Sequence, residues 1–214
     1  MDPLLPFLII AASYLLILIV NRLKNIGVAL IFSFSIITIL WALAFFSIYT
    51  REQTRITASK WIYQNIPSRS KILGEHWDDG LPIPLNSFNP NVYNAEQLTI
   101  YEPDNQEKIN YYAEKLSKAN YVIINSKRLY GTLMYLPEKY PITSKYYSLL
   151  FNGKLGYEKI AEFTAYPSIL GIDINDDTNE ETFQVYDHPK VMIFKNRNMF
   201  SYQEIKDIID KRLL

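Results

Sequence analysis

Residues 4–20 read LLPFLIIAASYLLILIV and residues 26–49 read IGVALIFSFSIITILWALAFFSIY, and neither segment contains an acidic or basic side chain. At about 1.5 Å of rise per residue, the second segment is long enough to cross a hydrocarbon core of roughly 30 Å, and the first is near the lower limit. We therefore predict a transmembrane helical hairpin within residues 1–50.

The short turn between the two segments sets the expected orientation of the hairpin. It carries Arg22 and Lys24, and basic turns are retained on the cytoplasmic side. Trp41 and Tyr49 lie near the opposite end of the second helix, where aromatic side chains act as interfacial anchors. We expect a multi-pass protein of the plasma (inner) membrane, with residues 51–214 extracytoplasmic. The bilayer is then the first partner of the chain.

Two other interpretations of the apolar segments fit the sequence less well. A secretory signal peptide needs a basic start and a small-residue cleavage site, whereas this chain opens Met1-Asp2-Pro3. Core helices of a soluble protein are apolar along one stripe, whereas these segments are apolar around their whole circumference. Since neither segment holds an ionisable residue for an ion or proton path, the hairpin is expected to be an anchor or part of a larger helical assembly.

The composition of the remaining residues bounds the function further. The chain has 22 basic and 22 acidic residues; without Arg22, Lys24 and Asp2, residues 51–214 keep 22 − 2 = 20 basic and 22 − 1 = 21 acidic ones. A nearly neutral domain lacks the positive field of a nucleic-acid binder, so we expect no nucleic acid as partner. The chain has no cysteine, which excludes disulfides and a thiol nucleophile. Its 17 tyrosines are expected to fill half-buried positions or to line a sugar groove.

Strand and helix patterns alternate through residues 51–214, which predicts one extracytoplasmic α/β domain, a sandwich with a mixed sheet. Apolar spacing and capping residues predict helices at 54–66, 104–118, 129–136, 143–152 and 201–213. Short apolar runs predict strands at 71–75, 97–101, 121–125, 157–165, 183–187 and 191–195, the last two joined by a tight connection at 187–190.

The most promising segment for binding follows the first predicted strand, because open α/β sheets gather ligands at the carboxyl ends of their strands. Its candidate substrate-binding residues are Glu75, His76, Trp77, Asp78 and Asp79. Trp77 offers a flat face for a sugar ring, the carboxylates accept hydrogen bonds from hydroxyl groups, and histidine is a residue type that can act near neutral pH, here at His76. The alternative is that Asp78 and Asp79 only organise a turn before Gly80.

Two further candidate substrate-binding residues are Arg128 and Tyr130. We assign no catalytic residue within this chain.

Metal chemistry is a further alternative that the residue spacing does not require. His76 and His188, with Asp78 or Asp79, could hold a divalent ion and form a metal-dependent hydrolase. The segment 173–181 resembles a calcium loop, but Thr178 occupies the required glycine position and Gln184 the twelfth position, so we interpret it as a solvated acidic loop. No glycine-rich phosphate-binding or GxSxG pattern occurs. We expect no metal and no cofactor.

Several strings occur in order along most of the outer domain, and each alone is weak. They are Arg55–Ile62, Asn65–Pro67, Glu75–Asp79 with Leu81-Pro82, Tyr140–Thr143 with Tyr146-Tyr147, Leu150–Tyr157 and Val185–Val191. Together they resemble the carboxyl-terminal end of membrane glycosyltransferases of the GT-C class, the group related to dolichyl-phosphate-mannose protein mannosyltransferases.

The resemblance implies partners and also an incomplete enzyme. Members of this class take a sugar from a polyprenyl-phosphate carrier on the extracytoplasmic side, and their catalytic carboxylate lies in the first external loop. No counterpart of that loop is found in this sequence, so we expect a fragment or subunit that needs further transmembrane helices. Its partners would be those helices, a lipid-linked sugar and a glycan or protein acceptor. The alternative function is a membrane-anchored glycan-binding or scaffold module without catalysis.

Overall fold

The structure, a computed structural model, describes residues 4–86 and 88–211 in two compact units. Of the described residues, 4–47 and 167–174 form the first unit, and 48–86, 88–166 and 175–211 form the second. The helical hairpin therefore forms one unit together with a short segment from late in the sequence, and the α/β domain forms the other.

The first unit contains helix α1 (Leu5–Leu23) and helix α2 (Asn25–Phe46), joined at Lys24, whose φ is +49°. Both helices are long and apolar enough to cross a membrane. Gly27 lets them approach closely near the turn, because a Cβ atom there would lie 2.7 Å from the carbonyl oxygen of Ile19. Strands β5 (Ser168–Ile169) and β6 (Ile172–Asp173) complete this unit as a two-stranded hairpin.

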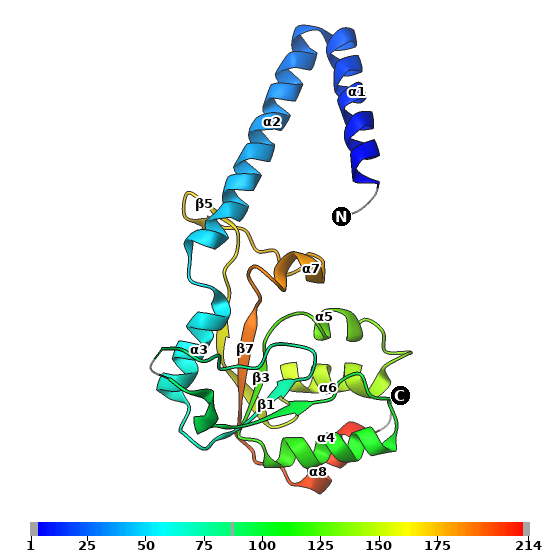
Figure 1. Ribbon diagram of the computed structural model, residues 1–214. Helices are drawn as coiled ribbons and strands as arrows, with labels where there is room; N and C mark the ends of the chain where they lie inside the picture. Colours follow the sequence, from blue (N-terminus) through cyan, green and yellow to red (C-terminus); the bar gives the residue numbers. More distant parts are fainter. Residues whose placement is uncertain (1–3, 87, 212–214) are drawn as a thin grey trace. The chain divides into compact units, whose positions relative to one another are not determined.

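The second unit is built on a five-stranded mixed sheet with strand order β2-β1-β3-β7-β4 (Figure 1). β1 pairs in parallel with β2 and β3, whereas β7 is antiparallel to both β3 and β4. The strands are β1 (Lys71–Glu75), β2 (Asn94–Leu98), β3 (Tyr121–Ile124), β4 (Tyr157–Phe163) and β7 (Val191–Asn196). The predicted α/β fold with a mixed sheet is confirmed.

The alternation of side chains along the strands creates two cores, one on each face of the sheet. Leu73, Val122 and Phe194 pack into the larger core, and their neighbours Ile72 and Ile123 pack into the smaller one. Helix α3 (Thr54–Asn65) covers the smaller core with Ala58, Ile62 and the following Ile66. The larger core lies beneath α4 (Gln106–Lys118), α6 (Pro141–Phe151) and α8 (Tyr202–Asp210) (Figure 1).

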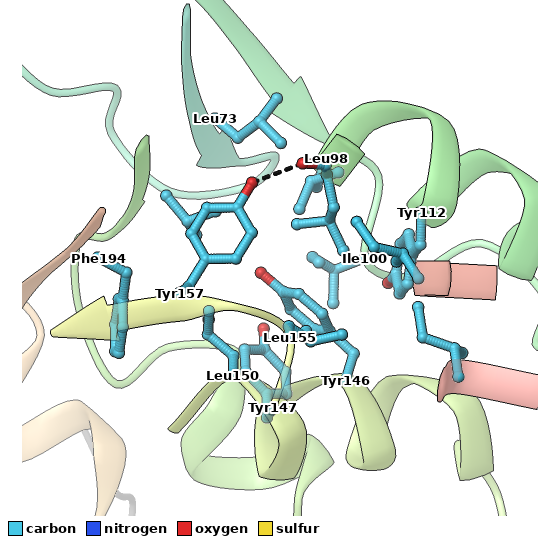
Figure 2. Close-up of a cluster of buried hydrophobic side chains, with 14 of the residues drawn as sticks. Leu73, Leu98, Ile100, Tyr112, Tyr146, Tyr147, Leu150, Leu155, Tyr157 and Phe194 are labelled. Atoms are coloured by element: carbon cyan, nitrogen blue, oxygen red, sulfur yellow. Dashed lines mark hydrogen bonds between the residues drawn. The ribbon is translucent and has the colours of Figure 1, made fainter. Parts of the chain in front are cut away.

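The larger core explains part of the high tyrosine content. Tyr112, Tyr146, Tyr147 and Tyr157 are fully buried in it and point their rings among aliphatic side chains (Figure 2). The Tyr157 hydroxyl donates to the carbonyl oxygen of Leu116 at 2.7 Å, which satisfies its polar end. These four tyrosines therefore belong to the core and are more deeply buried than the half-buried positions that the sequence led us to expect.

The helix ends follow the predicted capping chemistry. The Asn105 side chain accepts from the backbone N–H of Lys108 at the start of α4, and Ser201 forms a capping box with Glu204 at the start of α8. Pro141 occupies the first turn of α6, where its missing N–H costs nothing. Leu213, predicted to face inward from the last helix, lies outside the described residues.

Three predicted elements differ in the structure. Strand β2 begins at Asn94 and ends at Leu98, so the predicted strand at 97–101 begins three residues late. The predicted helix at 129–136 is shortened to α5 (Tyr130–Leu133). The predicted strand at 183–187 is wrong: helix α7 (Glu181–Gln184) and a turn occupy this segment.

The reason for the last difference lies in a buried polar contact. Gln184 points inward and donates to the side chain of Asp176 at 2.8 Å, and Asp176 also bonds the ring of His188 at 2.7 Å. These contacts fold residues 176–188 back on themselves. The short apolar stretch therefore packs as a helical turn and does not pair with a neighbouring strand.

One edge of the sheet is irregular. The pairing between β4 and β7 shifts register between Lys159 and Ala161. The opposite edge strand, β2, is five residues long and mostly polar. The register shift and the mostly polar strand therefore lie at the two edges of the sheet, in β4 and β2 respectively.

Candidate functional site

The candidate site lies at the edge of the sheet where β1, β2 and β3 end. Glu75 at the end of β1 pairs with Leu98 at the end of β2, and β3 runs parallel beside them and ends at Ile124. The loops after β1 and β3 therefore meet at this edge, as expected for ligand sites of open α/β sheets.

A buried ion pair joins the β1 loop to helix α3. The Arg55 guanidinium, at the start of α3, donates from Nη2 to Oδ1 of Asp78 at 3.1 Å and lies 3.2 Å, through Nη1, from Oδ2 of Asp79. The Asp78 side chain is 2% exposed, whereas that of Asp79 is 76% exposed. Asp78 is therefore the structural member of the pair, and Asp79 is accessible to solvent.

The β3 loop is tied to the same carboxylate. The Ser126 hydroxyl donates to Oδ2 of Asp78, and the Asn125 side chain donates to the carbonyl oxygen of Asp79. Both oxygens of Asp78 thus accept from different elements, Arg55 from α3 and Ser126 from the β3 loop. This arrangement satisfies a buried carboxylate that would otherwise be costly.

Trp77 sits within this network in a left-handed backbone conformation. Its φ is +79°, which is unusual for a bulky residue, and its carbonyl oxygen accepts from Nη1 of Arg128 at 3.2 Å. The indole is 63% exposed, with the His76 ring packed edge-on against it at a centroid distance of 5.0 Å. The network therefore fixes the backbone of Trp77 and leaves its aromatic face open.

Glu75 differs from the other candidates because it is buried beneath α6. Its Oε1 accepts from the Tyr147 hydroxyl at 2.6 Å, and its Oε2 has no hydrogen-bond partner among the described residues. Burial, with a smaller contribution from the negative charge of Asp78, raises the pKa of Glu75 to about 8 although the hydrogen bond from Tyr147 opposes the shift. Glu75 is therefore a neutral acid at pH 7 and does not contact solvent directly.

Arg128 and Tyr130 follow β3 and face different surroundings. The Arg128 guanidinium lies over the Tyr186 ring at 5.4 Å from its centroid. Tyr130 packs against Phe151 and Tyr147, and burial raises the pKa of its hydroxyl. Arg128 belongs to the Trp77 network, whereas Tyr130 belongs to a neighbouring cavity.

This cavity has a volume of about 590 Å³ and combines an aromatic wall with polar groups. Tyr130 and Phe151 line its apolar side, and Thr132, Asp177 and Glu181 line its polar side. Its lysines are already engaged, since Lys190 pairs with Asp177 at 2.8 Å and Lys127 donates to the backbone carbonyls of Asp177 and Asn179. An aromatic wall opposite hydroxyl and carboxylate acceptors suits an uncharged ligand rich in hydroxyl groups.

The two histidines do not come together. His76 is exposed beside Trp77, whereas His188 is buried against Asp176. Among residues 4–86 and 88–211, no group of three or more His, Cys, Asp or Glu side chains is arranged to hold a metal ion. The acidic segment 173–181 is also only partly solvated, because Asp176 is 2% exposed and bonded to Gln184 and His188.

Sequence reasoning missed Arg55, Asn125, Ser126 and Tyr147. Arg55 carried a usable signal, because a cation in the first turn of a helix opposes the helix dipole and indicates an acidic partner. Asn125 and Ser126 stand directly after a buried strand, at the edge already expected to bind ligands. Tyr147 gave no such signal, since its spacing on α6 is that of an ordinary core residue.

No protein-family model matches this sequence, and neither the curated proteins nor the solved structures include a match to the chain. The geometry of the site consists of an exposed indole, an accessible carboxylate and a guanidinium at the edge of the sheet where β1 and β3 end.

Replacing the two neighbouring aspartates should have unequal effects. Asp78→Asn leaves the Arg55 cation in a buried site with only the exposed Asp79 to compensate it, so we expect a loss of about 2–3 kcal/mol of unfolding free energy. The matched change Asp79→Asn should cost less than about 1 kcal/mol. Urea unfolding of the full chain in detergent, followed by tryptophan fluorescence, measures both. Equal losses would show that Asp78 is not the central acceptor.

Glu75 should make stability fall as the pH rises. Because the folded-state pKa of about 8 exceeds the ordinary glutamate value of 4.5, its contribution is complete below about pH 4.5 and is lost as the pH rises through 8. Glu75→Gln is neutral at every pH and similar in shape. It should reduce the loss of unfolding free energy at high pH by a few kcal/mol. Urea midpoints measured between pH 5 and pH 9 test it. A decline of the same size in both proteins would contradict the assignment to Glu75.

Proposed function

We propose that this chain is the C-terminal hairpin and extracytoplasmic domain of a membrane glycosyltransferase that uses a polyprenyl-phosphate-linked sugar. In this proposal the α/β domain contacts the acceptor through the loop that follows β1. Donor binding and the catalytic base come from further transmembrane helices, in the same polypeptide or in another subunit.

The observation that carries the proposal is the way Trp77 is presented. Its backbone is held in an unfavourable conformation by contacts to Arg128 and the Asp78 network, while 63% of the residue remains exposed. Strained, well-supported residues are concentrated at functional sites. An exposed indole, followed two residues later by the exposed Asp79 carboxylate, is a suitable surface for a sugar, since a sugar ring packs on an indole and its hydroxyls donate to a carboxylate.

The short length of chain after α2 limits how far Arg55 can lie from the proposed membrane. Arg55, which anchors the Asp78 network, follows the last residue of α2, Phe46, by nine residues. Nine residues span at most about 30 Å when fully extended, so the covalent link keeps the candidate site within that distance of the end of α2. A lipid-linked substrate in the bilayer is within reach of such a site.

Trp77→Ala should reduce sugar transfer to the acceptor by about tenfold or more in membranes that carry the complete enzyme, because it removes the proposed stacking surface. The control Tyr202→Ala removes an exposed aromatic residue, 39% accessible, from α8, outside the β1 loop and the 590 Å³ cavity, and should leave transfer unchanged. Transfer is measured from a polyprenyl-phosphate sugar donor after mild detergent extraction of the tagged full chain.

The same extraction tests the missing helices. We expect a co-purifying membrane protein, or a longer form of this chain, with many transmembrane helices and an acidic first external loop. Transfer that is unaffected by Trp77→Ala, or the lack of any such helical partner, would contradict the proposal.

The orientation is testable because the chain has no cysteine of its own. Single cysteines at Asn21, in the turn, and at Ser68, exposed in the α/β domain, give background-free labelling sites. In intact spheroplasts, a membrane-impermeant maleimide should label Ser68→Cys, and it should label Asn21→Cys only after lysis. The reverse pattern would place the α/β domain in the cytoplasm and end the sugar-transfer proposal.

A second candidate function is glycan binding without catalysis, and the 590 Å³ cavity lined by Tyr130, Thr132 and Glu181 favours it. One pair of measurements distinguishes glycan binding from sugar transfer. Binding of the full chain to immobilised neutral glycans, together with full cell-envelope glycosylation in a deletion strain, would favour the binding module over the transferase.

A further inference from the structure

A second apolar element accompanies the transmembrane helices in the first unit. Residues 167–174 form the β5–β6 hairpin, which groups with residues 1–47. The backbone N–H of Ser168 donates to the Ser47 hydroxyl at 2.9 Å, directly after the end of α2, and β5 lies beside that end of the helix (Figure 1). The hairpin is therefore fixed to the end of a helix long and apolar enough to cross a membrane.

The tip of this hairpin carries an apolar residue, Leu170, whose exposure to water and backbone conformation are both unfavourable. Leu170 and Gly171 form the two-residue connection, with φ values of +51° and +81°. Turns with two positive φ values favour Asn-Gly or Gly-Gly, and a bulky side chain in this conformation is strained. Leu170 is also 97% exposed, so its apolar side chain contacts almost nothing in the chain.

The neighbouring side chains extend this apolar tip along one face. Ile169 and Ile172 stand opposite each other across the hairpin, and Ile172 is 68% exposed. The next pair, Ser168 and Asp173, is polar. The hairpin thus has an apolar tip and a polar base, which is the distribution of a segment that enters a lipid interface from water.

We propose that the β5–β6 hairpin is a further membrane contact, which inserts Leu170 and Ile172 into the bilayer beside the end of α2. The inference rests on the proposed membrane insertion of α1 and α2. The exposed apolar residues at the end of α2 support it. Leu43 and Phe46 are 55% and 62% exposed and belong to the apolar surface that lipid would cover.

Lipid suits this tip better than a protein partner does. A specific protein interface buries about 800 Å² on each side, far more than two side chains at a hairpin tip supply. A bilayer requires no matching shape, and each apolar side chain that it covers adds to the binding.

Fluorescent labelling at single cysteines tests the inference on the full chain in phosphatidylcholine–phosphatidylglycerol vesicles. An environment-sensitive label is attached in turn to Leu170→Cys, to Ile37→Cys in the middle of α2, and to Ser68→Cys in the α/β domain. Spin-labelled lipids then quench the fluorescence according to depth. We expect Leu170→Cys to be quenched about twofold or more above Ser68→Cys, most strongly by lipids labelled near the headgroup.

The three labels separate the two proposals. If Ile37→Cys is quenched and Leu170→Cys behaves like Ser68→Cys, the hairpin contact is overturned while the membrane insertion of the helices stands. If Ile37→Cys is also unquenched, the membrane hairpin itself fails, and both proposals fail with it.

A second variant excludes local misfolding as the cause of a lost signal. Leu170→Asn creates Asn-Gly, the pair that two-residue turns of this kind prefer, so the β5–β6 pairing should persist or improve. With the label moved to Ile172→Cys, Leu170→Asn should lower quenching by about half. Unchanged quenching would overturn the role of Leu170 as the inserted side chain.

Discussion

The arrangement of the candidate site depends on a single carboxylate. Asp78 is nearly inaccessible to solvent and accepts from Arg55 of α3 on one oxygen and from Ser126 of the β3 loop on the other. A buried aspartate without these donors would be strongly destabilising, so the three elements must meet for the domain to fold. The conformation of Trp77, the exposure of Asp79 and the position of Arg128 all follow from this meeting point, because each lies within two residues of a member of the network.

The fold was largely predictable because its signals are local. The 3.6-residue spacing of Ile109, Tyr112 and Leu116 and the Asn105 cap define α4, and the buried run at 121–124 defines β3. The predicted strand at 183–187 failed because a buried side-chain contact between Gln184 and Asp176, eight positions apart, overrides a short apolar pattern. Short segments have too few residues for their periodicity to distinguish a strand from a helical turn.

The candidate site was predictable only in part. The expectation that strand ends gather functional groups directed attention to the β1 loop, whereas Arg128 was a candidate without a structural argument of its own. That expectation could not show that Glu75 is buried against Tyr147 while Asp79 is exposed, because that depends on the packing of α6 and on the path of the loop after β1. The ion pair between Arg55 and Asp78 joins residues 23 positions apart and on different elements, which a single sequence does not reveal.

The margins of the sheet have a consequence for the α/β domain in the membrane-anchored protein that we propose. Tethering confines molecules to two dimensions, so copies encounter one another more often than in solution, and an open strand edge then invites pairing between neighbours. Here the β4 edge shifts register between Lys159 and Ala161, and its outer positions include the charged Glu158 and Glu162. The other margin, β2, is short and polar. Crowded copies of the domain thus present poor templates for one another, which protects the chain against aggregation.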